Sequence, residues 1–199
     1  MKRLIVISGS SGVGKGTVLK EFMSSHPEFK LSISCTTRSK RSGEVDGVNY
    51  FFITRDEFQT AVENGDFLEW AEFSGNCYGT RKSFILKSLE KGDNIILEID
   101  TQGGLQVKKI MQEAVLIFIA PPSFDALKDR LYRRGTEPKE IIEERIAKAK
   151  SEFALAYKYD YIVVNDKLED AVSDAVSIIK TDRMRSERNL HLINDVLGK

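Results

Sequence analysis

The stretch that decides the fold is Gly9-Ser10-Ser11-Gly12-Val13-Gly14-Lys15-Gly16-Thr17. The apolar run Leu4-Ile5-Val6-Ile7 before it predicts a buried strand, and residues 18–23 after it predict a helix. Strand, glycine-rich loop and helix in this order form a phosphate-binding P-loop, in which backbone N–H groups and the helix N-terminus face one anion. The stretch therefore predicts a nucleoside triphosphate site, with Lys15 reaching the outer phosphates.

One position departs from the general P-loop pattern, in which a hydroxyl residue directly follows the lysine and binds Mg²⁺. Here Gly16 follows Lys15, and Thr17 comes next. The order Gly-Lys-Gly-Thr resembles the loop of adenylate kinases and of some other nucleoside monophosphate kinases. We expect Mg²⁺ to arrive with ATP, and its protein ligands stay open, with Thr17 a candidate either directly or through water.

Composition restricts the class of protein. The chain has 199 residues, of which 41% are apolar, so we expect one domain with a sizeable core. The formal net charge is zero, which argues against a large nucleic-acid interface. No apolar run approaches the roughly 20 residues of a membrane span, and Met1-Lys2-Arg3 leads directly into a core strand, so we expect neither membrane insertion nor a cleavable signal. Cys35 and Cys77 read as reduced thiols of a cytoplasmic protein.

Further apolar runs predict the rest of the core. Strands are expected at residues 31–34, 94–100, 115–120 and 161–164, and helices at about 101–112, 123–134, 138–159 and 168–188. Continuous rather than alternating hydrophobicity indicates burial on both faces, as in a parallel sheet. The predicted fold is therefore α/β, a doubly wound parallel sheet built from residues 1–34 and 91–199, with a helical lid at about 124–150.

Residues 35–90 interrupt the alternation of strand and helix. Strands are expected at 49–53 and 67–73, with a helix between them that starts at the capping box Thr54–Glu57 and ends near Gly65. This segment predicts a small mixed α/β insert that binds the second substrate. The tail after residue 186 carries apolar residues at helical spacing, which could pack on the body of the protein or on a partner, including a second copy.

Three groups of residues carry candidate chemistry. The first is Arg38 and Arg41 in a loop rich in hydroxyl residues, a composition that suits a phosphate monoester, although short basic runs are equally common on solvated loops. The second is Glu69 and Glu72 on the strand 67–73. Alternation alone leaves open which acid faces inward. An inward carboxylate suits guanine, whose N1–H and N2–H₂ donate side by side, and would be unpaired against adenine.

The third group consists of Arg130, Arg134 and Arg145. Arg130 and Arg134 are four residues apart on one helical face, and Arg145 lies on the next predicted helix. Arginines that converge over a P-loop neutralise the charge that builds up on a transferred phosphoryl group, whereas the alternative is ordinary surface arginine.

Taken in order, these segments resemble the guanylate kinase family over about residues 4–180. The resemblance rests on the P-loop and on ordered matches at residues 34–38, 41–52, 67–71, 78–80, 97–100, 120–123, 134–136 and 163–166. It implies ATP-dependent phosphorylation of GMP to GDP, with Mg²⁺. The part beyond residue 180 falls outside it.

The resemblance also implies roles for individual residues. Four would hold the GMP phosphate: Arg38, Arg41, Tyr50 and Tyr78. Four would surround the guanine: Ser34, Glu69, Thr80 and Asp100. The resemblance thus selects Glu69 over Glu72. Lys15, Arg130, Arg134 and Arg145 would gather on the ATP phosphates, and Asn165 would lie near the adenine.

Two alternatives stay open. Another nucleoside monophosphate kinase, for AMP, UMP or dTMP, fits the P-loop equally well, although Glu69, Ser34 and Thr80 suit guanine better. A non-catalytic guanylate-kinase-like binding module is the alternative from another class, but such modules typically lack a working P-loop, and here Lys15 and the loop glycines are present.

Overall fold

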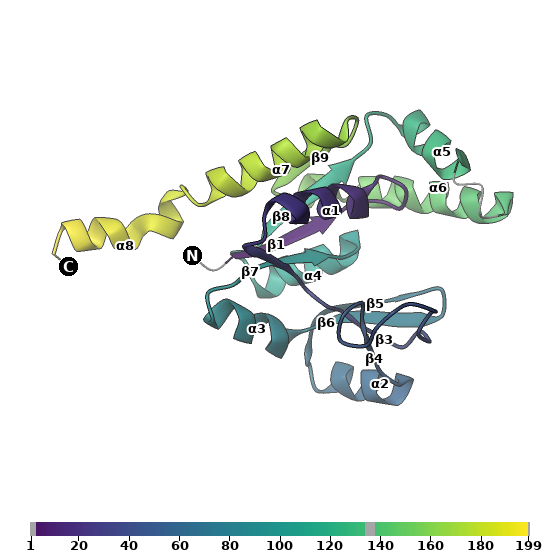
Figure 1. Cartoon of the computed structure of the whole chain (residues 1–199), viewed down its shortest axis with the longest axis horizontal. Coiled ribbons are helices and arrows are strands. Elements are labelled where there is room, and N and C mark those ends of the chain that lie inside the picture. Colours follow the sequence, from purple (N-terminus) through teal and green to yellow (C-terminus); the bar gives the residue numbers. More distant parts are fainter. Residues whose placement is uncertain (1–2, 134–137, 199) are drawn as a thin grey trace.

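The core of the protein is a five-stranded parallel sheet with the strand order β2-β7-β1-β8-β9 (Figure 1). The computed structural model describes residues 3–133 and 138–198. The strands are β1 (Arg3–Ser8), β2 (Phe29–Leu31), β7 (Asn94–Glu98), β8 (Val115–Ala120) and β9 (Tyr161–Val164). The α/β prediction with a parallel central sheet is confirmed.

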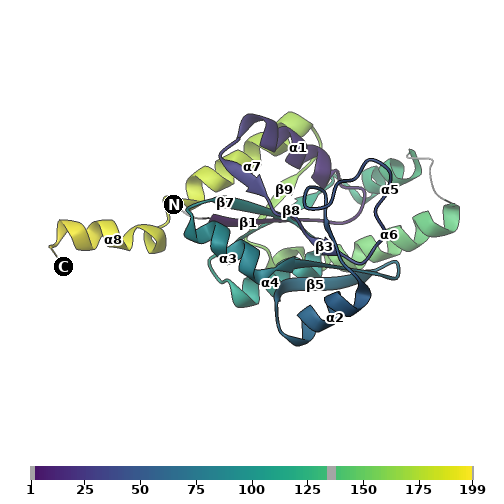
Figure 2. The same cartoon turned by 60° about the horizontal axis from the view of Figure 1, so that its bottom comes forward.

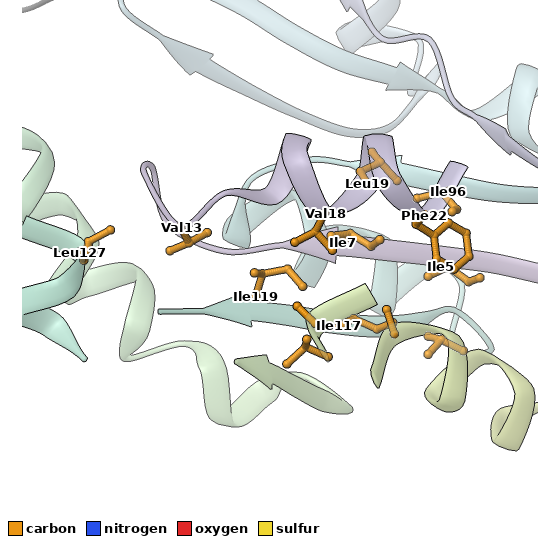
Figure 3. Packing of buried hydrophobic residues seen from close by; sticks show 14 of the residues in the cluster. Ile5, Ile7, Val13, Val18, Leu19, Phe22, Ile96, Ile117, Ile119 and Leu127 are labelled. Atoms are coloured by element: carbon orange, nitrogen blue, oxygen red, sulfur yellow. The ribbon is translucent and has the colours of Figure 1, made fainter. Parts of the chain in front are cut away.

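Helices cover both faces of this sheet, which explains the continuous apolar strands. Successive residues of β1 point to opposite faces: Ile5 and Ile7 join one core cluster, whereas Leu4 and Val6 join another. Figure 3 shows the first cluster, in which Phe22 and its neighbours pack against the strands. It gathers residues from α1 (Lys15–Ser25), α5 (Phe124–Arg133), α6 (Lys139–Phe153) and α7 (Leu168–Asp182); the second involves α3 (Lys82–Glu90) and α4 (Thr101–Ile110).

A second, four-stranded sheet has the order β4-β3-β6-β5 and lies beside the core with α2 (Arg55–Glu63) against it (Figure 2). Its strands are β3 (Cys35–Thr36), β4 (Phe51–Phe52), β5 (Phe67–Phe73) and β6 (Asn76–Arg81). β3 pairs with β4 in parallel and with β6 antiparallel, so the sheet is mixed. α2 begins at the capping box formed by Thr54 and Glu57, and its Phe58 fills a small separate core.

Several predicted boundaries were wrong. The strand predicted at 31–34 lies at Phe29–Leu31, and the one predicted at 49–53 is reduced to Phe51–Phe52. β7 ends at Glu98 rather than at 100, because the Asp100 carboxylate caps α4 by accepting from the Gly103 N–H. The helix predicted to continue to 159 ends at Phe153 and is followed by the 3-10 turn η1 (Ala156–Lys158). The sequence analysis did not identify β3, β6 or α3.

The helix predicted at 168–188 is two helices, α7 and α8 (Ser186–Val196). The buried carboxylate of Asp182 at the end of α7 forms an ion pair with Arg188 Nε at 2.7 Å, which draws the first turn of α8 back toward α7. Beyond this ion pair, α8 extends away from the body (Figure 1), and Leu190, Ile193 and Val196 are all more than half exposed. The tail therefore contacts the body at its first turn, where Arg188 Nη2 donates to the Glu113 carbonyl at 2.9 Å, whereas its apolar residues Leu190, Ile193 and Val196 stay largely exposed.

The buried core sheet and the exposed helix α8 predict losses of stability of very different size when an isoleucine is truncated. Ile117 lies in the centre of β8 with no exposed surface, so Ile117→Ala should lower the free energy of unfolding by about 2–5 kcal/mol. Ile193→Ala on α8 is the control and should change it by less than about 0.5 kcal/mol. Urea denaturation of both variants checks this, and equal losses would contradict the placement of α8.

Candidate active site

The P-loop joins β1 to α1 and depends on backbone conformations that glycine allows. Gly14 has φ of 91°, in the left-handed region, and a Cβ atom there would lie 2.5 Å from Asn165 Nδ2. Asn165 follows β9, and its Nδ2 donates to the Val13 carbonyl at 2.8 Å. The loop is therefore held in shape by a residue that lies 152 positions later in the chain.

Lys15 folds back over this loop. Its Nζ donates to the carbonyl oxygens of Gly9 at 2.6 Å and of Ser10 at 3.2 Å. Burial lowers the pKa of Lys15, and the carboxylates of Glu98, Glu152 and Asp100 partly offset this effect. The amine thus lies at the loop, in a field of nearby acids that favours its charged form.

Two of the three predicted arginines lie at the P-loop. Arg130, on α5, donates to the carbonyl of Asn165 at 2.8 Å and to that of Val13 at 3.4 Å. Arg145, on α6, lies with its Nη1 3.5 Å from Ser11 Oγ. The structure therefore brings Lys15, Arg130, Arg145 and Asn165 to one loop. Arg134 lies outside the described residues.

A second polar group forms on the small sheet and its loop. The Arg38 guanidinium lies 5.5 Å from the centre of the Tyr50 ring, and the rings of Tyr50 and Tyr78 are 6.0 Å apart. Arg38 Nη2 donates to Glu44 Oε1 at 2.7 Å, and the pKa of Arg38 is raised chiefly by this hydrogen bond. The Arg41 backbone N–H donates to the other oxygen of Glu44, and the residue is exposed. Glu44 thus organises both arginines, a role the sequence analysis did not assign.

Glu69 is the buried acid of β5, whereas Glu72 is exposed and paired with Arg55 at 3.3 Å. The pairing of β5 with β6 shifts register between Phe67 and Glu69, so Leu68 and Glu69 are both buried although they are adjacent. Alternation could not select the inward acid, because Glu69 and Glu72 lie three residues apart, one on each face of a strand that carries apolar residues on both faces.

The Glu69 carboxylate is buried, with little access to water, and is held by Thr80. Thr80 Oγ1 donates to Glu69 Oε1 at 2.6 Å. Burial raises the pKa of Glu69 to about 7, the Thr80 hydrogen bond opposes the rise, and the charge of Asp100 adds to it. A carboxylate held this way is suited to accept from a ligand that carries paired donors.

The carboxyl end of β7 connects the two groups. Asp100 influences the pKa of both Lys15 and Glu69, and Glu98 influences the pKa of both Lys15 and Tyr50. These acids therefore lie between the P-loop and the small sheet. Ser34 directly precedes β3 and is half-buried, and its carbonyl accepts from the Phe51 N–H.

Other residues of the site were not identified from the sequence. Glu152 lies seven residues after Arg145 on α6 and is buried, and within the part of the chain that the structure describes its Oε2 has no hydrogen-bond partner. Burial raises its pKa, with Lys148, Lys15 and the Ser11 backbone N–H acting in the opposite direction. The seven-residue spacing, which repeats a helical face, was the available indication.

Within residues 3–133 and 138–198, no cluster of three or more acidic, histidine or cysteine side chains could hold a metal ion. In the same part of the chain, no helix has both the length and the apolar character needed to cross a membrane.

Comparison with known proteins agrees with this arrangement. A family model described as guanylate kinase matches residues 1–182. The chain is 48% identical over 197 residues to a guanylate kinase of Streptococcus pneumoniae, which covers 98% of this chain and 95% of the relative. It is 47% identical to one from Lactococcus lactis subsp. lactis, with 97% and 96% covered. A crystal structure of guanylate kinase from Anaplasma phagocytophilum superposes with a TM-score of 0.73 at 31% identity, covering 94% of this chain and 89% of that one. The chain belongs to the guanylate kinase family.

Proposed function

We propose that this chain carries out its family's reaction, the transfer of the γ-phosphoryl group of ATP to GMP to give ADP and GDP, at the carboxyl end of the core sheet. The observation that carries the proposal is the buried Glu69 carboxylate, which lies on the same side of the molecule as the P-loop and shares the field of Asp100 with Lys15. A P-loop alone fits many monophosphate kinases, whereas a buried acceptor pairs with guanine and not with adenine.

In this proposal the small sheet binds GMP. Arg38, Arg41, Tyr50 and Tyr78 hold its phosphate, because the guanidinium groups and phenol hydroxyls offer several donors to one dianion. The guanine lies against four side chains, of which Glu69 accepts from N1–H and N2–H₂: Ser34, Glu69, Thr80 and Asp100.

ATP binds on the other side of β7. The backbone N–H groups of residues 9–17 surround its β- and γ-phosphates, and Asn165 lies toward the adenine. Lys15, Arg130, Arg134 and Arg145 neutralise the charge that spreads over the equatorial oxygens in the transition state. A GMP phosphate oxygen attacks the γ-phosphorus in line, with no covalent enzyme intermediate.

Mg²⁺ would supply positive charge that neutralises part of the charge of the ATP phosphates. The oxygen donors near the loop fit such an ion: Thr17 carries a hydroxyl, and Glu98 is close enough to Gly16 that a Cβ atom there would lie 3.6 Å from its carboxylate. Thr17 and Glu98 would hold it directly or through water. The chain's own residues orient the two nucleotides and exclude water.

We further propose that residues 35–90 and 124–150 close over GMP and ATP respectively, because an exposed phosphoryl group would be lost to water. Cys35 and Cys77 are buried free thiols, which supports a reducing, cytoplasmic location.

Lys15→Ala should lower kcat on the order of a hundredfold or more, because one cation is removed from the transition state. A coupled assay with ATP and GMP measures this, and GMP binding by calorimetry should be nearly unchanged. Lys20→Ala, an exposed lysine on the same helix, is the control. A Lys15→Ala enzyme with ordinary kcat would refute the proposed ATP site.

Arg41→Ala should raise the KM for GMP several-fold and leave the KM for ATP nearly unchanged, since Arg41 contributes to the acceptor phosphate alone. Titrating each nucleotide against saturating amounts of the other separates the two constants. Lys40→Ala, the exposed neighbour, should behave like the wild type. A change confined to the KM for ATP would mean that Arg41 contributes to the ATP site and not to the GMP phosphate.

Glu69→Gln should lower kcat/KM for GMP by about thirty- to a thousand-fold, because the charge is lost and a donor then faces a donor. The kcat/KM for AMP should fall much less, so the discrimination between GMP and AMP should collapse. Glu72→Gln is the matched control and should be nearly silent. If Glu72 instead governs this ratio, the assignment of the guanine acceptor is wrong.

The raised pKa of Glu69 adds a pH dependence. Guanine requires the ionised carboxylate, so kcat/KM for GMP should fall as pH drops through about 7. Stability should move the other way: between the ordinary value of 4.5 and about 7 only the folded state holds the proton, so stability falls as pH rises through this window. Taking the ratio of wild type to Glu69→Gln at each pH cancels the titration of GMP itself.

A further inference from the structure

β5 is an edge strand of the small sheet, and its free edge faces α4 of the core. Figure 2 shows α4 alongside β5. An edge strand presents backbone N–H and C=O groups with no strand to pair them. At Trp70 a side chain takes the place of that missing strand: Gln106 Oε1 accepts from the Trp70 N–H at 3.1 Å, and Gln106 Nε2 donates to the Trp70 carbonyl at 3.0 Å.

The same face of α4 also meets the Glu69 side chain. Gly103 lies three residues before Gln106, on the same side of the helix. A Cβ atom on Gly103 would lie 2.7 Å from Glu69 Oε2, so the carboxylate rests directly on the helix backbone. Two residues of α4 therefore contact two successive residues of β5, one at the backbone and one at the carboxylate.

The hydrogen bonds between Gln106 and Trp70 restrict the backbone position from which the Glu69 side chain projects. The Trp70 N–H belongs to the peptide unit that joins Glu69 to Trp70, so holding that group restricts the backbone from which the Glu69 side chain projects. The register irregularity just before Glu69 leaves β5 less firmly held by β6 at this point. A second restraint on the opposite edge compensates for it.

We propose that Gln106 is a positioning residue for guanine recognition: its carboxamide closes the free edge of β5 at Trp70 and thereby holds the Glu69 carboxylate over Gly103. The inference rests on the proposed role of Glu69 as the guanine acceptor. Gln106 acts on GMP through the backbone of β5 and touches neither ATP nor the transferred phosphoryl group.

Gln106→Met tests this, because methionine has a similar length and cannot form either hydrogen bond. We expect the KM for GMP to rise about tenfold, the GMP-to-AMP preference to fall by a similar factor, and the KM for ATP to change less than twofold. The Trp70 amide should exchange its hydrogen faster, measured by NMR. Gln102→Met, the same substitution on an exposed residue of α4, is the control and should leave all four values unchanged.

Gln106→Glu provides a second test of the two hydrogen bonds at Trp70. A carboxylate offers acceptors only, so it cannot donate to the Trp70 carbonyl as the carboxamide does. At pH 8 the variant should therefore resemble Gln106→Met, with a similar rise in the KM for GMP, a KM for ATP that changes less than twofold, and faster exchange of the Trp70 amide.

Three outcomes would overturn the proposal. Unchanged GMP-to-AMP preference in Gln106→Met, while Glu69→Gln loses it, would refute the role of Gln106 and leave the proposed function standing. An equal rise in both KM values would show a general structural effect instead. If Glu69→Gln itself keeps the preference, the guanine assignment fails, and the inference fails with it. In the double variant Glu69→Gln, Gln106→Met, we expect little further loss of preference.

Discussion

The parallel pairing of β1 with β7 on one side and β8 on the other is the constraint on which the site depends. Parallel strands end at the same edge of a sheet, so the segments that follow them meet there. The P-loop follows β1, Asp100 follows β7 and Asn165 follows β9. Because the strands are buried on both faces, a one-residue register slip would move each side chain into the opposite core cluster and disrupt the packing of both, which keeps this edge in place.

Charge is divided across that edge. Cations gather on the P-loop side, where Lys15, Arg130 and Arg145 come from three different helices. Acids occupy the end of β7, and the buried Glu69 lies beyond them on the small sheet. Under the proposed function GMP would span the acidic side, with its guanine at Glu69 and its phosphate at Arg38 and Arg41, and the transferred phosphoryl group would come from ATP on the cationic side.

The features that could be predicted from the sequence are those whose physical cause lies in neighbouring residues of the chain. Continuous apolar runs and the P-loop are local, so β1, β8 and β9 were predicted within a residue or two. β6 was missed because its buried positions are Cys77, Gly79 and Thr80, which do not read as an apolar strand. The break between α7 and α8 places Asp182 and Arg188 in an ion pair, and Glu69 rather than Glu72 lies against Gly103 of α4. Both are tertiary effects, and so is the pairing of Gln106 with Trp70.

The cations of the site already donate to oxygens of the protein. Lys15 donates to the Gly9 carbonyl, Arg130 to that of Asn165, and Arg38 to the Glu44 carboxylate. A phosphate that binds here exchanges one acceptor for another, so the number of hydrogen bonds changes little, and the net gain comes from the greater charge of the phosphate. The geometry of these donors is thereby set before a nucleotide arrives, and less ordering is left for the binding step to supply. In the proposed reaction, this preorganisation of the cations by internal acceptors would help to align the two phosphates for transfer.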